Sequence, residues 1–550
     1  MLLHQPTTSR PQLHDRNPHH VSLSSTLSYS LTFPYGVSNS SVLRLVSSHR
    51  SQVITCSTSQ VHSYGKVYYE RKSMLKWNAL YKRISLMEKP ELGSASVLNQ
   101  CENEGKQLAK WELCRVVKEL RKFRRYKSAL EVYEWMNNRG EKFRMSTSDA
   151  AIQLDLISKV HGIRSAEKYF LKLPDTLKDK RIYGSLLNAY VRARMREKAE
   201  SLFDQMRNRC YASHALPFNV MMTLYMNLKD YDKVDATVWE MMEKNIPLDI
   251  YSYNIWLSSR GSQGSAEKME QVFEQMKLDR NINPNWSTFS TMATMYIKLG
   301  QLQKAEDCLK KVESRIMAWD RIPYHYLISN YGGVGNKEEV HRVWNIYKSK
   351  FPYIPNLGYH AVISSLVRLG DIEGAEKIYE EWLSVKTAYD SRIGNLLLGW
   401  YVRKGFSEKA KAFFEQMGEL GAKPNSSSWE ILSEIHISDR RISLALSCLK
   451  EAISAEGSKN WKPKPVNVSS ILKLCEQEAD TVNKEVLLGM LRQLGCLVDE
   501  AYMSYIPLSN GMAAGNALST EKGRPDDDDG GGGDDEEGAE MLLNQLQESF

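Results

Sequence analysis

The chain has 550 residues, of which 42% are hydrophobic and 25% are charged, proportions typical of folded soluble proteins and not of a wholly disordered chain. Its length exceeds that of one ordinary core and predicts either roughly three or four domains or a repeat array. The formal net charge of +7 is unevenly distributed: residues 1–63 carry +3 and residues 521–550 carry −9, which leaves +13 on residues 64–520. A basic body is compatible with a polyanionic partner, and also with solubility alone.

Cysteine usage and hydropathy exclude several classes of protein. The eight cysteines lie far apart and form no Cys-x-x-Cys pair, which argues against a disulfide scaffold and against a structural zinc site. No run of about 18 apolar residues occurs, as a transmembrane helix would require. We therefore predict reduced thiols, no metal site, no cofactor and no membrane span.

The N-terminal segment has the composition of an organelle transit segment. Residues 1–59 contain fourteen serines, a few spaced arginines and one acid, without the apolar core of a secretory signal. Residues 53–57 (Val-Ile-Thr-Cys-Ser) resemble a loose plastid processing site. We predict a disordered transit segment over residues 1–63 and a chloroplast location, with the mitochondrion as the alternative and an ordinary disordered N-terminus also open.

Beyond a predicted helical lead-in over residues 64–109, the sequence repeats. Ala410 is followed by apolar residues at +3, +4 and +7, which is one face of an amphipathic helix. This quartet recurs ten times between residues 129 and 445, with steps of 33 to 37 residues and a mean near 35. Glycines five residues before the small residue strengthen the register, at Gly300, Gly335, Gly370 and Gly405.

Each repeat therefore predicts a helix, a tight turn, a second helix and a loop. One such hairpin cannot bury its apolar face alone, so neighbouring hairpins must stack. We predict an all-α fold, an α-solenoid of about ten to eleven helix-turn-helix repeats over residues 110–500. Residues 501–550 form an acidic, glycine-rich tail, which we expect to be disordered and solvated.

The most complete unit runs from Gly394-Asn395 through Gly405, Ala410, Phe414 and Met417 to Gly421-Ala422-Lys423-Pro424-Asn425. It closely resembles the pentatricopeptide repeat family, and the similarity extends over about residues 110–460. The resemblance implies a plant organellar member of the pure-repeat class and a right-handed superhelix. It also implies sequence-specific binding of single-stranded RNA, one nucleotide per repeat.

In this family the fifth and the last residues of a unit read the base, and the second residue sandwiches it. The resemblance therefore implies these base-reading pairs: Asn219 with Asp249 for U, Asn254 with Asn285 for a pyrimidine, Ser290 with Asp320 for G, and Asn395 with Asn425 for a pyrimidine. His325 and His360, the latter with Asp390, occupy reader positions with undetermined bases. The implied sandwiching residues are Leu216, Tyr251, Ile322 and Leu357.

Two departures from the family pattern limit the reading. Irregular spacing near Asn285 and Pro355-Asn356 leaves the last reader of the His325 unit ambiguous. The first three units place Cys114, Ala151 and Gly184 at the fifth position, and these side chains cannot make a bidentate amide contact. We expect those units to be structural or weakly reading.

Catalytic signatures are missing from the sequence. It contains neither the His-x-Glu and Cys-x-x-Cys motifs of a deaminase nor a phosphate-binding Gly-rich loop with Lys-Ser/Thr. We predict a protein without enzymatic activity. It would act by occupancy, so that its binding to an RNA affects the stabilisation, processing, splicing or translation of that RNA. The alternative is a protein-binding scaffold that uses the same groove for a peptide or a partner helix.

Overall fold

The computed structural model describes residues 76–87, 92–455, 461–498 and 500–503, which are almost entirely helical and contain no strand. The α-helices are α1 (Trp77–Ser85), α2 (Gly93–Asn103), α3 (Lys110–Lys122), α4 (Tyr126–Asn137), α5 (Thr147–Val160), α6 (Ile163–Lys172), α7 (Lys180–Arg192), α8 (Arg196–Asn208), α9 (Ala215–Asn227), α10 (Tyr231–Glu243), α11 (Ile250–Ser262), α12 (Ala266–Leu278), α13 (Trp286–Lys298), α14 (Leu302–Glu313), α15 (Ile322–Val334), α16 (Lys337–Lys350), α17 (Asn356–Arg368), α18 (Ile372–Val385), α19 (Ser391–Arg403), α20 (Ser407–Glu419), α21 (Ser426–Ser438), α22 (Ile442–Ser454), α23 (Pro465–Gln477), α24 (Thr481–Gln493) and α25 (Glu500–Met503). Two short 3-10 helices, η2 (Asp175–Leu177) and η4 (Cys496–Val498), complete the described elements.

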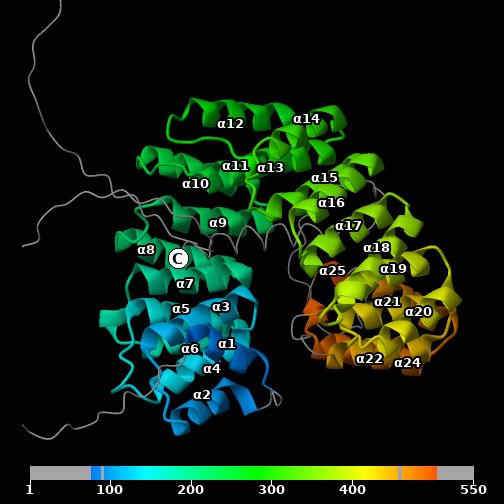
Figure 1. The fold of residues 1–550 in the computed structure, drawn as a ribbon. Coiled ribbons are helices and arrows are strands. Elements are labelled where there is room, and N and C mark those ends of the chain that lie inside the picture. The colour runs from blue at the N-terminus through cyan, green and yellow to red at the C-terminus, as the bar shows by residue number, and fades with distance from the viewer. Residues whose placement is uncertain (1–75, 88–91, 456–460, 499, 504–550) are drawn as a thin grey trace, which may run out of the picture. The chain divides into compact units, whose positions relative to one another are not determined.

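The helices alternate between two layers. From α3 onward, the odd-numbered helices up to α23 are the first helices of the hairpins (A helices), and the even-numbered helices up to α24 are the second (B helices). From α5 onward each A helix packs against the next A helix, and each B helix packs against its own A helix and the next one. Consecutive hairpins therefore lie side by side (Figure 1). This arrangement confirms the predicted α-solenoid, with ten hairpins from α3 to α22 and an eleventh formed by α23 and α24.

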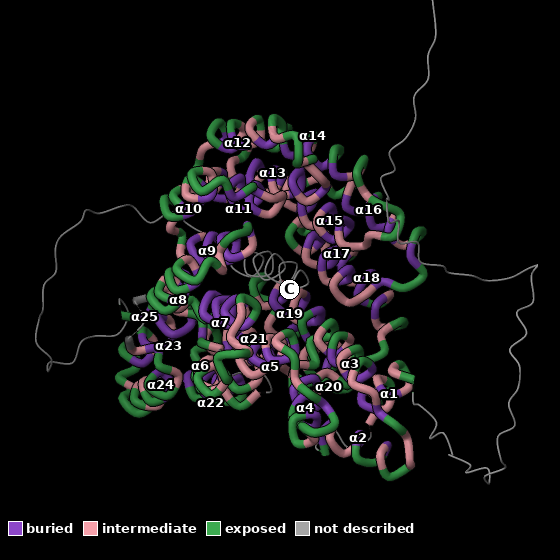
Figure 2. Tube along the Cα trace, turned by 90° about the vertical axis from the view of Figure 1, so that its left-hand side faces the viewer, coloured by how far each residue is buried: buried purple, intermediate pink, exposed green. Residues whose placement is uncertain are grey.

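The small or apolar residue that begins each B-helix quartet is buried in every unit, and this shared packing requirement explains the regular spacing. All ten residues of this set are fully buried in the B helices: Ala129, Ala166, Ala199, Val234, Met269, Ala305, Val340, Ala375, Ala410 and Ala445. Buried residues are most numerous on A helices such as α7 and α9, which are packed on several sides, whereas B helices such as α8 and α10 bury one stripe. Figure 2 colours many residues along α10 and α12 green, as exposed.

The turn between the helices of a hairpin requires a left-handed backbone. Gly300, Gly370 and Gly405 have φ angles of 70°, 75° and 75°, a region that glycine enters without steric penalty. Arg194 and Lys229 occupy the same place in earlier units, with φ angles of 52° and 55°. The predicted turn is thus a property of the hairpin even where glycine is replaced.

Two glycines within A helices permit close contact between neighbouring A helices. A Cβ atom at Gly332 of α15 would lie 2.7 Å from the Cβ of Ser365 in α17. A Cβ atom at Gly261 of α11 would lie 2.5 Å from the Cγ of Met295 in α13. Because real Cβ atoms do not approach so closely, larger residues at these sites would push the A helices apart.

The ends of the array extend the same packing. In the lead-in, α1 packs against α3 and α2 packs against α4, and Leu80 and Leu98 are fully buried there. At the other end the Tyr502 hydroxyl in α25 donates to the carbonyl oxygen of Pro463, at 2.5 Å. The predicted transit segment and residues 504–550 of the predicted tail lie outside the described residues and stay predictions. The predicted start of a disordered tail at residue 501 is wrong, because residues 501–503 are helical and the Tyr502 side chain is buried in the core of the last hairpin.

Three findings concern only the described part of the chain. Its seven cysteines are free thiols. No group of three or more His, Cys, Asp or Glu side chains there could hold a metal ion. None of its helices combines the length and the apolar character needed to cross a bilayer.

Candidate nucleic-acid interface

Four of the five predicted last readers, all except Asp320, cap the N-terminal ends of A helices. The Asp249 side chain accepts a hydrogen bond from the backbone N–H of Ser252 at 2.8 Å and begins α11. Asn425 begins α21 in the same way, through the N–H of Ser428 at 2.9 Å. Asp and Asn are favoured at this position since their short side chains satisfy N–H groups that the helix leaves unpaired.

The capping residue of one unit meets the fifth residue of the preceding unit. We call the contact between the N-terminal ends of two successive A helices a seam. In the seam between α9 and α11, the Asn219 amide nitrogen lies 3.0 and 3.1 Å from the two carboxylate oxygens of Asp249. In the seam between α19 and α21, Asn395 Nδ2 donates to Asn425 Oδ1 at 3.2 Å. The structure therefore brings together two of the four complete reader pairs.

A serine hydroxyl completes both seams. Ser252 Oγ donates to Asn219 Oδ1 at 2.7 Å, and Ser428 Oγ donates to Asn395 Oδ1 at 2.8 Å. Both serines are fully buried. Each asparagine reader is thus held at its amide nitrogen and at its carbonyl oxygen by side chains of the next unit.

The seam between α11 and α13 is built differently. Asn254 Nδ2 donates to Ser287 Oγ at 3.0 Å, and Ser287 Oγ donates to Asn285 Oδ1 at 2.7 Å. Asn254 and Asn285 are therefore connected through a hydroxyl and make no direct bond. Asn254 Oδ1 is buried without a hydrogen-bond partner.

Three further predicted readers have other partners. Ser290 Oγ accepts a hydrogen bond from Asn330 Nδ2 of α15 at 3.3 Å, whereas Asp320 Oδ1 accepts one from the N–H of Ile322 at 3.1 Å. His325 Nε2 lies 2.9 Å from the Tyr347 hydroxyl of its own B helix.

The environment of His325 also lowers its basicity. Burial, assisted by the nearby charge of Arg321, lowers the pKa of His325 to about 4. His325 Nδ1 is buried without a hydrogen-bond partner. This side chain therefore lies inside its hairpin as a neutral imidazole at physiological pH.

Asp390, the predicted last reader of the His360 unit, makes hydrogen bonds to other residues of the chain. Asp390 caps α19 through the N–H of Arg392 and accepts a hydrogen bond from Asn356 Nδ2 at 3.1 Å. Burial opposes the charge of Asp390, but the contact with Arg392 outweighs it and lowers the pKa of this carboxyl. His360 is half-buried.

Reader and sandwiching residues differ in accessibility. Asn219 is 0% exposed and Asn254 is 4% exposed, while Asn395 is half-buried. The predicted sandwiching residues are all half-buried in the first turn of their A helices. They are Leu216, Tyr251, Ile322 and Leu357. A base could therefore contact the sandwiching residues directly, whereas Asn219 has no surface open to a base in this conformation.

Basic residues gather at the opposite end of the A helices. The last turns of α3, α5, α7, α13, α17 and α19 carry lysine or arginine: Arg121, Lys122, Lys159, Arg192, Lys298, Arg368 and Arg403. In the first three units Arg121, Lys159 and Arg192 all lie within 3.4 Å of the carboxylate of Asp155. Three cations around one acid give this cluster a net positive charge.

Sequence reasoning missed the serines and one acidic reader position. Ser252 and Ser428 follow their capping residues by three positions, the spacing of a capping box, so this signal was available. Glu430 occupies the fifth position of the α21 unit and is 4% exposed. Its carboxylate accepts hydrogen bonds from the N–H of Lys464 and from Trp461 Nε1, and burial raises its pKa.

A second polar arrangement connects four of the A helices, α7, α9, α13 and α19, with the B helices before and after them. The Tyr190 hydroxyl donates to Glu167 Oε1, and Lys198 Nζ lies 2.7 Å from the same carboxylate. The lysine and the tyrosine lower the pKa of Glu167. Three other units repeat this triad: Tyr225/Glu200/Lys233, Tyr296/Glu270/Lys304 and Tyr401/Glu376/Lys409.

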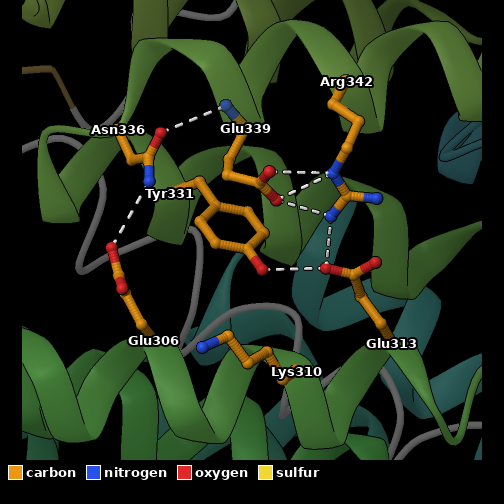
Figure 3. A pocket seen from close by; sticks show the side chains of 7 residues that line it. All are labelled: Glu306, Lys310, Glu313, Tyr331, Asn336, Glu339 and Arg342. Atoms are coloured by element: carbon orange, nitrogen blue, oxygen red, sulfur yellow. Dashed lines mark hydrogen bonds and ion pairs between the residues drawn. The ribbon is translucent and has the colours of Figure 1, made fainter.

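The α15/α16 unit departs from the triad because Glu339 replaces the lysine. Two acids would then face each other, and the Tyr331 hydroxyl instead donates to Glu313, which also contacts Arg342 (Figure 3). Glu306 accepts only from Asn336 among the side chains drawn there. The rearrangement leaves a pocket of about 420 Å³ between α14 and α16.

The fold and the seams define a class: a helical-hairpin repeat protein in which polar side chains of successive units meet at regular intervals. A family model described as "Pentatricopeptide repeat domain" matches residues 236–298, and one described as "PPR repeat" matches residues 181–211, 287–315, 359–385 and 395–421. A pentatricopeptide repeat-containing protein of Arabidopsis thaliana is 61% identical over 470 residues, which cover 86% of this chain and 90% of that protein. This chain belongs to the pentatricopeptide repeat family.

Two further relatives are less similar to this chain. A mitochondrial pentatricopeptide repeat-containing protein of Arabidopsis thaliana is 34% identical over 82% of this chain and 89% of its own length. The large ribosomal subunit protein mL101 of the same plant is 35% identical over 75% of this chain and 84% of its own length. Among solved structures, the pentatricopeptide repeat protein PPR10 in complex with an 18-nt psaJ RNA element is 17% identical, with a TM-score of 0.42 over 78% of this chain and 61% of that chain.

Proposed function

We propose that this protein binds single-stranded RNA in an organelle and selects its target by base sequence. The observation that carries the proposal is the paired contact of Asn219 with Asp249 and of Asn395 with Asn425, each across 30 residues and two repeats. Packing alone does not require an amide and its partner at this recurring place. Base recognition does require them, since amides match the donor and acceptor groups of a base edge.

The base assignments follow the family pattern at the units with complete readers. We expect U at the Asn219 unit, a pyrimidine at the Asn254 unit, G at the Ser290 unit and a pyrimidine at the Asn395 unit, with two unassigned bases between the last two. The half-buried Leu216, Tyr251, Ile322 and Leu357 would contact the base faces. Basic residues in the last turns of the A helices would contact phosphates.

The buried readers add a condition to this mode of binding. Because Asn219 has no exposed surface, neighbouring side chains must make room before a base pairs with it. The contacts with Asp249 and Ser252 leave the second N–H and the second carbonyl lone pair of the Asn219 amide for a base. Mismatched bases would then leave buried amide groups unpaired, which is a strong source of discrimination.

A direct test measures binding of the purified full-length chain to fluorescently labelled RNA. One RNA carries U-pyrimidine-G, two arbitrary bases and a pyrimidine, and its partner carries the same bases in scrambled order. We expect the matched RNA to bind at least about tenfold more tightly, with an affinity that falls as salt rises. An affinity indifferent to both base order and salt would rule out the proposal.

We further propose that the protein acts by occupying its target and not by catalysis. Its binding would shield an RNA end, hold an intron in shape or expose a ribosome site. Purified protein incubated with its matched RNA should leave the RNA length and base composition unchanged. Cleavage or deamination of that RNA would contradict this part of the proposal.

The organelle is also a proposal. The serine-rich segment before residue 63 favours the plastid, whereas several relatives carry mitochondrial in their names. A fluorescent fusion to residues 1–63 imported into isolated chloroplasts and mitochondria would distinguish the two. Crosslinking and sequencing of RNA from the importing organelle would then identify the transcript.

One relative suggests a second candidate function. The likeness to mL101, whose name places it in a large ribosomal subunit, is compatible with this chain serving as a scaffold within a ribonucleoprotein. Sedimentation of organelle extracts distinguishes the two roles. Co-migration with ribosomal subunits at all salt concentrations would favour the scaffold, and release by moderate salt would favour a dissociable RNA-binding protein.

A further inference from the structure

In three seams a serine 33 residues after the reader contacts the reader's amide. The equal separation means that the serine comes from the first turn of the next A helix, beside the capping residue. The three pairs are Asn219 with Ser252, Asn254 with Ser287, and Asn395 with Ser428.

The seam between α9 and α11 fixes which end of the reader amide faces which neighbour. Asp249 can only accept hydrogen bonds when ionised, so the Asn219 nitrogen, 3.0 Å away, must donate to it. The carbonyl oxygen at the other end then faces Ser252, whose hydroxyl lies 2.7 Å from this oxygen and 3.0 Å from Asp249 Oδ1, so the shorter contact of its single hydrogen is to the reader. Ser252 and Asn219 are both fully buried, where an unpaired polar atom is unfavourable.

The seam between α19 and α21 reaches the same orientation with a neutral capping residue. The backbone N–H of Ser428 donates to Asn425 Oδ1 at 2.9 Å, which directs that oxygen toward the helix end. Asn395 Nδ2 donates to the same oxygen. The hydroxyl of Ser428 again donates to the reader's carbonyl, so one serine both caps the helix and orients the reader.

The seam between α11 and α13 has the opposite orientation. Asn285 lies 36 residues after Asp249, so the extra residue places Ser287 second in its helix and not third. The Ser287 hydroxyl donates to Asn285 Oδ1, and the Asn254 nitrogen donates to Ser287. The Asn254 carbonyl is therefore left without a partner.

We propose that Ser252 and Ser428 are specificity-determining residues that set the donor and acceptor polarity of the reader amide, and that Ser287 sets the reverse polarity. The inference rests on the proposed function and names residues that position the reader without touching the base. An amide held in one orientation distinguishes uracil, which donates from N3, from cytosine, which accepts there. An amide that can rotate binds uracil and cytosine without distinguishing them.

The test replaces Ser252 with alanine and measures binding to two RNAs that differ only by U or C at the base aligned with the Asn219 unit. Loss of one hydroxyl contact should lower the U-to-C affinity ratio by about 3- to 10-fold. The ratio at the neighbouring base, read by Asn254, should stay at the wild-type value. A general structural defect would instead weaken binding to all RNAs equally.

Two matched variants accompany Ser252→Ala. Ser252→Thr retains the hydroxyl and should restore the wild-type ratio. Thr288→Val removes a buried hydroxyl that has no hydrogen-bond partner, and it should leave the ratio unchanged. Circular dichroism melting of each variant establishes that it is folded.

The two proposals fail in different ways. A wild-type protein that binds RNA without distinguishing U from C at this base would overturn the reader assignment, and with it the role of Ser252. A wild-type protein that distinguishes them, together with a folded Ser252→Ala variant that keeps the full ratio, would overturn the role of the serine alone.

Discussion

Acidification should destabilise the hairpin that contains His325. This imidazole is 7% exposed and has a pKa of about 4 in the folded chain, against an ordinary value near 6.5 in the unfolded chain. Between these two values the unfolded state binds a proton that the folded state does not. Stability therefore rises with pH across this window and is lost as pH falls from about 6.5 to about 4.

The size of the effect follows from the difference between the two pKa values. A difference of about 2.5 units at roughly 1.4 kcal/mol per unit corresponds to a loss of about 3 kcal/mol. Burial keeps the imidazole in its neutral form, and His325 Nε2 lies 2.9 Å from the Tyr347 hydroxyl inside the hairpin. Replacing His325 by glutamine removes the titrating group and keeps a polar side chain near that hydroxyl.

The assay is urea unfolding followed by tryptophan fluorescence at pH 7.0, 5.5 and 4.5. Repeat arrays can unfold in parts, so we compare the transition that reports on α15 and α16, where Trp344 is buried. Wild type should lose more stability on acidification than His325→Gln, by about 1 kcal/mol for each pH unit below 6.5. The exposed His161, changed to glutamine, serves as the matched control and should behave as wild type. Parallel pH dependence of wild type and His325→Gln would refute the reasoning.

Four other predictions follow from contacts described above. Glu339→Lys should lower stability by about 1 kcal/mol or less, because it removes the partly exposed ion pair of Glu339 with Arg342 and places two cations side by side; a higher melting temperature would contradict it. Gly332→Ala should destabilise the chain by about 1–3 kcal/mol, because its Cβ would lie 2.7 Å from that of Ser365, and unchanged urea unfolding would refute it. Asn219→Ala should weaken binding of the U-containing RNA by about 1–3 kcal/mol in an anisotropy titration, while RNA mutated at that base should bind equally to both proteins. Arg403→Ala should lower the dependence of log affinity on log salt by about 0.7 without altering base preference, so a changed preference would count against a phosphate contact.

Much of the architecture could be predicted from the sequence because one packing rule is repeated many times. The small residue of the B helix, as at Ala410, is fully buried wherever the pattern predicted it. The turn glycines, as at Gly405, have the positive φ that their spacing indicated. Both features depend on neighbours within about 20 residues in the chain, and periodicity reveals such local requirements directly.

The seams could be predicted only in part because each is made by two units. The family resemblance paired Asn219 with Asp249 and Asn395 with Asn425, and the structure brings the members of each pair into contact. The resemblance did not predict that Asn254 and Asn285 are separated by a hydroxyl, since one inserted residue changes the register of the next helix start. His325 shows the same limit: its partner Tyr347 belongs to the core of its own hairpin, and no spacing rule indicates which way a histidine at this position turns.

The construction of a seam from two hairpins has a consequence for how such arrays change over evolution and in engineering. Asn219 belongs to one hairpin, while Asp249 and Ser252 cap the next. Under the proposed reading, exchange of a single hairpin would alter two letters of the recognised RNA, its own and the one before it. To change a single base of the target, recombination must instead exchange a segment that contains both the reader and the start of the A helix that follows it.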